Sequence, residues 1–193
     1  MNKIKVIKNF FTQEECDFYI QYIEANIDKF QQTKKSKRYV WMFGDELSMG
    51  ASKSPIKVNL DLSPIADIET KVRDLFRRVE TVAKETYKNE NDLFVTSLLL
   101  TKQVPGAFIT PHYDTDGGIN YYFKYSAIIY LNTMKQDGIL EFPNLGYSYS
   151  PEAGDFLMFP SGEEESLHQV TKISEDRYSL PMWLTEDASW RIK

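Results

Sequence analysis

The chain contains only two histidines in 193 residues, and each lies in a setting that suits a metal ligand. His112 opens the triplet His112-Tyr113-Asp114, and His168 lies far downstream. Residues two apart on an extended strand point to the same side, so His112 and Asp114 can hold one ion while Tyr113 faces away. Two imidazoles and one carboxylate form a facial triad, which leaves three positions of an Fe(II) ion open for substrate and oxygen. These residue types therefore indicate a non-haem iron site.

The sequence around His112 favours a site over an incidental pair. An isolated His-x-Asp motif is common and usually binds nothing. Here Pro105-Gly106 and Pro111 precede the motif and Gly117-Gly118 follow it, which places the motif at the mouth of a strand beside a flexible loop. The aromatic loop over residues 115–124 is either a mobile lid over the site or an ordinary surface loop.

His168 opens a second predicted strand. Residues 168–173 alternate in polarity, which predicts that His168, Val170 and Lys172 share one face and the other three residues share the opposite face. A lone buried histidine is more often a hydrogen-bonded core residue than a ligand. A structural domain with incidental histidines therefore stays an alternative, and it predicts that His168→Ala changes nothing but stability.

The composition describes an acidic, globular chain. Its 193 residues are 42% hydrophobic and carry a formal charge of −5, which suits one domain with a substantial core and disfavours a general nucleic-acid binder. The only dense basic run, residues 34–38, is interpreted as a solvated loop rather than a binding patch. We expect one domain over residues 1–193, in which residues 1–92 are mainly helical support and residues 93–193 form the core that carries the site.

Cysteine usage and hydropathy favour a cytoplasmic protein. The single Cys16 permits no internal disulfide and falls on the apolar face of a predicted helix, where we expect a small buried hydrophobe. The N-terminus lacks the apolar core of a signal peptide, and no segment approaches the ~20 apolar residues that span a bilayer. We therefore expect no membrane partner.

Two amphipathic helices are predicted in the first half of the chain. Thr12 and Glu15 match a capping box, and apolar residues at helical spacing then predict a helix over residues 13–30. Ser63-Pro64 predicts the start of a second helix, whose apolar stripe runs over residues 65–83.

From residue 93 the pattern changes to that of short strands bounded by turn residues. The predicted strands cover residues 93–100, 125–132, 138–142, 155–159, 168–173 and 178–184. Such spacing predicts an antiparallel sandwich or a small jelly-roll barrel, which can enclose one ligand. The two helices would cover one outer face of the larger sheet.

Several short motifs occur in an order that is more specific than any one of them. They are Asn9-Phe10-Phe11, Pro105-Gly106-Ala107-Phe108, Pro111-His112-Tyr113-Asp114, Tyr130-Leu131-Asn132, Gly138-Ile139-Leu140-Glu141-Phe142-Pro143, Gly154-Asp155-Phe156-Leu157-Met158-Phe159-Pro160, His168-Gln169-Val170, and Arg177-Tyr178-Ser179-Leu180 with Trp183. With these motifs the chain resembles, over nearly its whole length, the prolyl 4-hydroxylase-like family of Fe(II)- and 2-oxoglutarate-dependent oxygenases. The resemblance implies an α+β fold in which a double-stranded β-helix, or jelly-roll barrel, has N-terminal helices packed on its larger sheet.

The resemblance also implies roles for single residues. Arg177 matches the basic residue that binds the distal carboxylate of 2-oxoglutarate, which suits a guanidinium because it forks onto a carboxylate and stays charged when buried. Tyr130 matches a tyrosine that shares this carboxylate through its hydroxyl. The implied iron ligands are His112, Asp114 and His168, and the apolar residues along the carbon chain of the cosubstrate are Ile128 and Val170. Partners for the second nitrogen of each histidine are expected as well.

The chain departs from the family pattern at three places. Gln103 stands nine residues before His112, where many relatives carry a tyrosine near the cosubstrate, and its amide can still donate a hydrogen bond. Asp137-Gly138 stands where relatives often have two glycines, and Asp176 precedes Arg177 where glycine is frequent. We expect Asp176 to face solvent, since an inward carboxylate would compete for Arg177.

The implied reaction hydroxylates a C–H bond while 2-oxoglutarate and O2 become succinate and CO2, with ascorbate as a candidate for keeping the iron reduced. A prolyl residue in a peptide or protein is the leading substrate, and residues 121–123 with residues 41–43 could line a groove for it. The alternatives are a free amino acid or another small metabolite, and a module that binds metal or 2-oxoglutarate without turnover. Nucleic-acid demethylation is disfavoured by the acidic composition.

Overall fold

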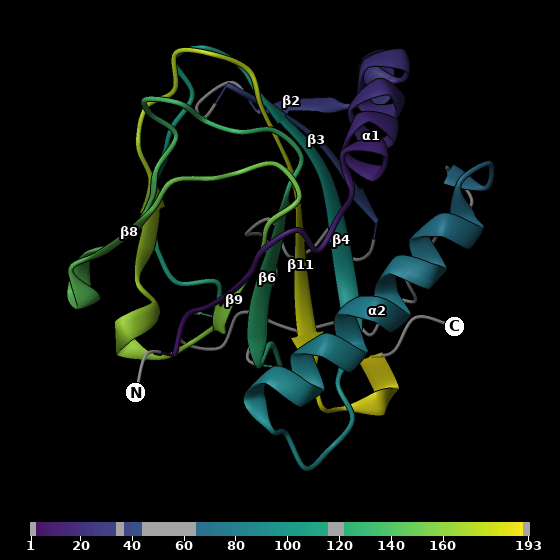
Figure 1. Cartoon of the computed structure of the whole chain (residues 1–193), viewed down its shortest axis with the longest axis vertical. Helices are drawn as coiled ribbons and strands as arrows, with labels where there is room; N and C mark the ends of the chain where they lie inside the picture. Colours follow the sequence, from purple (N-terminus) through teal and green to yellow (C-terminus); the bar gives the residue numbers. More distant parts are fainter. Residues whose placement is uncertain (1–2, 34–36, 44–64, 116–121, 191–193) are drawn as a thin grey trace.

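The described part of the chain, residues 3–33, 37–43, 65–115 and 122–190 of a computed structural model, forms two antiparallel sheets and two α-helices (Figure 1). In order across the seven-stranded sheet, the strands are β1 (Lys5–Ile7), β9 (Phe156–Pro160), β6 (Tyr125–Tyr130), β11 (Arg177–Thr185), β4 (Phe94–Gln103), β3 (Arg38–Phe43) and β2 (Gln31–Thr33). The four-stranded sheet has the order β5 (Ile109–His112), β10 (His168–Val170), β7 (Leu140–Phe142) and β8 (Tyr147–Tyr149).

Helix α1 (Gln13–Ala25) begins at the predicted capping box. Thr12 Oγ1 accepts a hydrogen bond from the Glu15 amide at 3.2 Å, and the Glu15 carboxylate accepts one from the Thr12 amide at 2.9 Å. The helix ends at Ala25 rather than at residue 30, because Asn26 leaves the helical conformation and a short 3-10 turn, Ile27–Lys29, follows. Cys16 is fully buried on its inner face, as predicted.

Helix α2 (Glu69–Tyr87) begins later than predicted. The expected start at residues 63–64 lies outside the described residues, and residues 65–68 form a tight turn in which the Ile68 amide donates to the Ile65 carbonyl at 2.9 Å. The predicted apolar stripe is otherwise present, since Val72, Leu75 and Val79 are buried. Within the described ranges, neither helix combines the length and the apolar character that crossing a bilayer requires.

The seven-stranded sheet has a separate apolar core on each face. On one face, helix residues such as Ile23 and Val72 pack with Leu100 of β4. On the other face, Tyr130 of β6 packs with Val170 and other residues of the four-stranded sheet. In Figure 1 the two helices and the four-stranded sheet accordingly lie on opposite sides of the larger sheet.

The first third of the chain contributes strands as well as helices. Strand β1 pairs with β9 at one edge of the larger sheet, and β3 pairs with β4 near the other edge. Three strands from residues 5–43 therefore extend the sheet on both sides, which the helical interpretation of residues 1–92 did not include.

The strand predicted over residues 168–173 is shorter than expected. Strand β10 ends at Val170, so the alternation holds for His168, Gln169 and Val170 alone. Lys172 is exposed and Ile173 is buried with Ala107 and Met134, which reverses the predicted faces. The Ile173 amide donates to the Ala107 carbonyl at 3.0 Å, so the chain turns here toward β4 instead of continuing the sheet.

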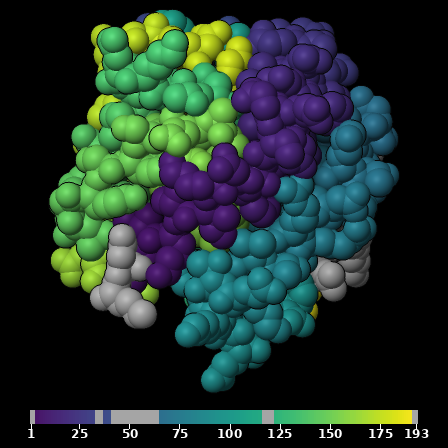
Figure 2. Space-filling view, in the orientation of Figure 1, coloured from purple at the N-terminus to yellow at the C-terminus, as the bar shows by residue number. Residues whose placement is uncertain are grey.

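The N-terminal segment lies on the surface of the molecule beside α2, as the space-filling view shows (Figure 2). Gly154 lies close to the Phe11 backbone of this segment. Its carbonyl accepts a hydrogen bond from the Phe11 amide at 3.0 Å, its φ is +83°, and a Cβ at this position would lie 2.5 Å from the Phe11 carbonyl oxygen. Only glycine fits both constraints.

Replacing Gly154 with alanine is expected to destabilise the fold by more than about 2 kcal/mol, because positive φ and a backbone clash add. Gly146→Ala is the matched control, since Gly146 also has a positive φ, of +57°, but has no atom within 4 Å of the added Cβ. The control is expected to cost about 1 kcal/mol. Urea unfolding measures both free energies, and equal losses would contradict the assignment of a clash at Gly154.

Candidate metal and cosubstrate site

The three predicted ligands meet in one place. His112 ends β5 and His168 begins β10, and these two residues are direct partners across the antiparallel pair. Asp114 follows β5 by two residues, so one ligand atom from each of the three side chains lies within 4.8 Å of the others. The Nε2 atoms of His112 and His168 lie 3.5 Å and 3.8 Å from the two Asp114 carboxylate oxygens.

Backbone carbonyls set the tautomer of both imidazoles. His112 Nδ1 lies 3.0 Å from the Thr110 carbonyl oxygen, and His168 Nδ1 lies 2.9 Å from the Ser166 carbonyl oxygen. A carbonyl can only accept, so each Nδ1 carries a proton, and Nε2 is the nitrogen left to bind a metal when the imidazole is neutral. These carbonyls are the partners that were expected for the second nitrogens.

A serine holds the Asp114 carboxylate in place. Ser126 Oγ of β6 donates to Asp114 Oδ2 at 2.5 Å and lies 2.9 Å from Ser161 Oγ. Since one carboxylate oxygen is engaged in this way, the geometry favours a single-oxygen contact to a cation through Oδ1. Sequence reasoning missed Ser126, because a serine in an apolar strand carries no signal of what it faces.

Burial and mutual charge shift the pKa values of the triad. Burial alone would raise the pKa of Asp114, but the charges of His168 and His112 and two hydrogen bonds hold it well below its usual range. Burial lowers the pKa of His168. Burial also tends to lower the pKa of His112, but the hydrogen bond and charge of Asp114 outweigh it and raise the net value. Asp114 is therefore anionic and ready to bind a cation.

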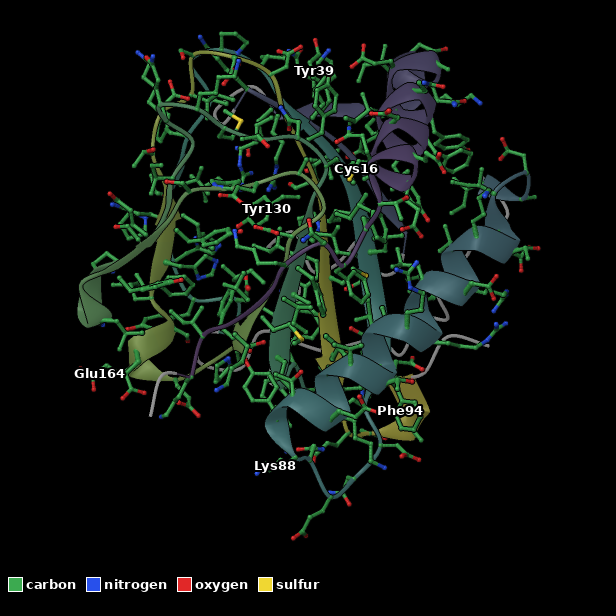
Figure 3. The ribbon with its side chains drawn as sticks, in the orientation of Figure 1. Cys16, Tyr39, Lys88, Phe94, Tyr130 and Glu164 are labelled. Atoms are coloured by element: carbon green, nitrogen blue, oxygen red, sulfur yellow. The ribbon has the colours of Figure 1, made fainter. Side chains whose placement is uncertain are left out.

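Arg177 begins β11, toward the opposite end of the strand from Trp183. Its side chain lies on the face of the larger sheet that is turned toward the four-stranded sheet. It is 3% exposed, its guanidinium lies 5.2 Å from the Tyr130 ring, and its Nη1 donates to Gln103 Oε1. Burial lowers the pKa of Arg177, and the neighbouring Tyr130 hydroxyl offsets this only in part. Burial raises the pKa of Tyr130 to about 12, so this hydroxyl keeps its proton and can donate. Tyr130 is labelled in Figure 3 between the two sheets.

This end of the site is built for an anion. Within the described ranges, Arg177 forms no salt bridge with a carboxylate, although a buried guanidinium normally requires one. Arg177 Nε, Gln103 Nε2 and Tyr130 Oη are all buried and have no hydrogen-bond partner among the residues that the structure describes. Three unsatisfied groups around one cation fit the carboxylate of a dicarboxylic acid.

The apolar residues expected beside the cosubstrate are also here. Ile128 and Val170 belong, with Tyr130, to the core between the two sheets. Gly138 packs against Arg177, since a Cβ would lie 3.3 Å from Arg177 Cδ. Asp176, which was expected to face solvent, is partly exposed, and its carboxylate binds Lys102 at 3.0 Å.

Arg38 is a site residue that the sequence interpretation missed. The basic run 34–38 was taken as a solvated loop, but residues 34–36 lie outside the described ranges and Arg38 begins β3. Gln103 is the direct partner of Arg38 on one side and of Arg177 on the other, so the three side chains share one face. Burial and the charge of Arg177 lower the pKa of Arg38, and the charge of Asp114 offsets this only in part. The β-strand pattern of residues 38–43 was the signal that could have revealed it.

The proposed peptide groove is only partly described. Residue 121 and the side chains of residues 41–43 lie outside the description. Phe123 is buried and stacks on Trp183 with ring centroids 5.4 Å apart, while Tyr122 stacks on Trp190 at 3.8 Å. The described end of the 115–124 loop thus packs against β11 and the C-terminal 3-10 helix, Ala188–Trp190.

A comparison with family models finds a match in the region that forms most of the two sheets. Residues 98–185, which include the triad and Arg177, match the model of the 2OG-Fe(II) oxygenase superfamily. This match covers less than half of the chain and shows what this region is similar to. No curated protein matches the chain.

Solved structures with the same fold include several oxygenases. A viral collagen prolyl hydroxylase from Paramecium Bursaria Chlorella virus-1 is 16% identical with a TM-score of 0.63, and the match covers 96% of this chain and 97% of that one. A prolyl-4-hydroxylase from Pseudomonas putida is 16% identical with a TM-score of 0.67 over 96% and 93% of the two chains. An oxidoreductase of the 2OG-Fe(II) oxygenase family from Burkholderia pseudomallei is 16% identical with a TM-score of 0.70 over 99% and 89%. At this identity the likeness concerns the fold.

Metal affinity is expected to fall at mildly acidic pH. A histidine must be neutral to bind a metal, and the raised pKa of His112 means that protons begin to compete above its usual value of 6.5. Below that pKa, the affinity for Mn(II) should drop about tenfold per pH unit for one competing proton. Calorimetric titration with Mn(II) between about pH 5 and pH 8 measures how the affinity depends on pH. An affinity that is constant over the range would contradict the placement of His112 as a ligand.

Ser126→Ala is expected to weaken Mn(II) binding by about 10- to 100-fold, because Asp114 loses the hydrogen bond that orients it. Ser148→Ala is the matched control, since Ser148 is exposed on β8. The same calorimetric titration compares the two variants with the unmodified protein. If both serine variants bind Mn(II) equally well, Ser126 does not position Asp114.

Proposed function

We propose that the chain is an Fe(II)- and 2-oxoglutarate-dependent dioxygenase that hydroxylates a C–H bond of a prolyl residue in a peptide or protein. One observation carries the proposal. The cluster of His112, Asp114 and His168 and the buried Arg177, which has no salt bridge among the described residues, both border the apolar core between the two sheets. A metal centre together with a buried guanidinium suits a cosubstrate that is at once a chelator and a dicarboxylate.

In this proposal the two histidines and Asp114 hold Fe(II) through His112 Nε2, His168 Nε2 and one carboxylate oxygen. Their arrangement on one side leaves the other positions of the ion to small molecules. When bound, the iron and 2-oxoglutarate supply the oxidising chemistry, in which decarboxylation of the cosubstrate by O2 is coupled to hydroxylation of the substrate. The protein supplies geometry, charge and exclusion of water.

Arg177, Tyr130 and Gln103 are proposed to bind the distal carboxylate of 2-oxoglutarate. Arg177 contributes charge and Tyr130 a neutral hydroxyl, while Gln103 fixes the guanidinium through Nη1 and offers its own amide N–H. Ile128 and Val170 would contact the methylene groups between the two ends. Gln103 thereby takes the place of the tyrosine that is common in relatives.

The proposal extends to the architecture. We take the two facing sheets as the two halves of a double-stranded β-helix, in which residues 93–193 form the jelly-roll core with the site and residues 1–92 support it as part of one domain. Contacts of α1 and α2 with β4 place both helices on the larger sheet, which supports this arrangement.

The prolyl substrate is supported by solved structures of the same fold. Two of the structures named above are prolyl hydroxylases, and a third, a prolyl hydroxylase from Trichoplax adhaerens, was solved with a peptide fragment of hypoxia inducible factor at a TM-score of 0.61 and 16% identity. A peptide requires an open groove beside the metal, whereas a small metabolite requires a closed pocket. A substrate screen distinguishes them.

The test is a screen of proline-containing peptides and free amino acids with protein, Fe(II), 2-oxoglutarate and ascorbate. We expect succinate release coupled to the gain of one oxygen atom on a prolyl peptide, read by mass spectrometry. Succinate without any oxidised substrate in the screen would contradict the prolyl assignment, and no succinate at all would favour a binding module.

Arg177→Gln is expected to raise the KM for 2-oxoglutarate by on the order of 100-fold, because charge-assisted hydrogen bonds to the carboxylate are lost. Arg77→Gln is the matched control, since Arg77 is exposed on α2 and pairs with Asp74. Succinate formation measured against 2-oxoglutarate concentration gives both KM values. If the two variants behave alike, Arg177 does not bind the cosubstrate.

A further inference from the structure

A second serine lies behind the serine that holds the metal carboxylate. Ser161 follows β9 directly and is fully buried, and its Oγ lies 2.9 Å from Ser126 Oγ. Ser126 Oγ in turn lies 2.5 Å from Asp114 Oδ2. The two hydroxyls and the carboxylate therefore form one chain of hydrogen bonds, and the role of its outer member is not accounted for by the scheme above.

The direction of this chain follows from the chemistry of its members. Asp114 is held anionic, so its Oδ2 can only accept, and Ser126 must use its one hydroxyl proton for this bond. In the contact with Ser161, the Ser126 oxygen is then the acceptor, which makes Ser161 the donor. Protons thus point in one direction, from Ser161 through Ser126 to Asp114.

The backbone of Ser161 holds its hydroxyl in place. The Ser161 amide donates to the Lys124 carbonyl at 3.0 Å, and the Ser161 carbonyl accepts from the Thr115 amide at 3.4 Å. Thr115 follows Asp114 directly, and Lys124 directly precedes β6, the strand that carries Ser126. One residue is therefore bonded both to the segment of the metal carboxylate and to the strand of its serine.

Close packing fixes the same segments a second time. A Cβ on Gly162 would lie 3.1 Å from Thr115 Cβ, so the chain after Ser161 is in contact with the chain after Asp114. Thr115 Oγ1 also donates to the Phe123 carbonyl at 3.4 Å. Hydrogen bonds among buried groups are stronger than in water, and neighbours in a chain reinforce one another. The position of the Ser161 hydroxyl is accordingly set by the fold.

The direction of the chain decides how Asp114 can bind a cation. Because Oδ2 accepts from Ser126, the oxygen directed to a metal is Oδ1, which lies 3.5 Å from His112 Nε2. A carboxylate can bind a cation through one oxygen or through both. Binding through both would occupy one more position of the ion, whereas a facial triad depends on positions that stay open for small molecules.

We propose that Ser161 is a positioning residue of the metal centre. Its hydroxyl orients that of Ser126, so that Asp114 binds the metal through Oδ1 alone and one more position of the ion stays open for the cosubstrate. The inference rests on the proposed function and adds to it a residue that acts through Ser126.

The first test is a double-mutant cycle on the affinity for Mn(II), measured by calorimetric titration. Ser161→Ala is expected to weaken binding about 2- to 10-fold, as for one lost hydrogen bond. The double variant Ser126→Ala, Ser161→Ala should bind no more weakly than Ser126→Ala alone, because Ser161 then has no hydroxyl to orient. A purely structural loss at Ser161 would instead weaken binding equally in both backgrounds.

Ser97→Ala is the matched control for this cycle. Ser97 is also buried in the larger sheet, and its hydroxyl has no hydrogen-bond partner among the described residues. The control should bind Mn(II) like the unmodified protein. Losses that add in the double variant, or a Ser161→Ala affinity equal to that of the control, overturn the proposal.

The second test uses the unmodified protein, so it does not depend on whether the serine variants fold. A crystal structure of the Mn(II)-loaded protein should show Asp114 Oδ1 on the metal and Oδ2 still bonded to Ser126. Coordination through Oδ2, or through both oxygens, overturns the proposal.

The two tests separate this inference from the proposed reaction, because neither requires turnover. A coupled cycle in a protein that releases no succinate retains the role of Ser161 and rejects the reaction. Succinate release by a protein whose cycle is additive retains the reaction and rejects the role of Ser161.

Discussion

The structure depends on a short antiparallel pairing between β5 and β10. These strands are four and three residues long, and their register sets His112 directly opposite His168. A metal needs its ligand atoms within a few tenths of an ångström of fixed positions, so a slip of one residue would turn one imidazole to the other face. The carbonyls of Thr110 and Ser166, each two residues before its histidine, then fix which nitrogen faces inward. The remaining elements hold this pairing against the larger sheet.

Charge is distributed to keep the two ends of the site distinct. Asp114 is held anionic by its neighbours at the metal end, while Arg177 is buried without a carboxylate at the other end of the described site. A network on the helix side supports this separation, because Lys102 binds both Glu24 of α1 and Asp176. The carboxylate nearest to Arg177 in sequence is thereby drawn away from it. Helix α1 thus contributes to the site through Glu24.

Sequence reasoning found the groups whose chemistry is visible in their residue type. Two histidines in a whole chain and the His-x-Asp spacing indicate a metal, whereas the role expected of Arg177 rested on the resemblance to the oxygenase family. The roles of Ser126 and Arg38 could not be predicted in this way, because they arise from cross-strand register, which sequence does not specify for strands of mixed polarity. The predicted boundaries of α2 and β10 were wrong for a related reason, because hydrogen bonds that end an element are not visible in the sequence pattern. A local turn over residues 65–68 precedes the start of α2 at Glu69, and a tertiary hydrogen bond from Ile173 to Ala107 follows the end of β10 at Val170.

The most direct measurement is an anaerobic titration of the protein with Fe(II) and 2-oxoglutarate, followed by visible absorption. Chelation of the metal by the cosubstrate gives a weak charge-transfer band, which requires the triad and the carboxylate-binding end to act on one molecule. We predict that the band appears with one equivalent of 2-oxoglutarate per chain and is absent from His168→Ala. A band of equal strength in that variant, or none in the unmodified protein, would contradict the central claim that these residues form one iron and 2-oxoglutarate site.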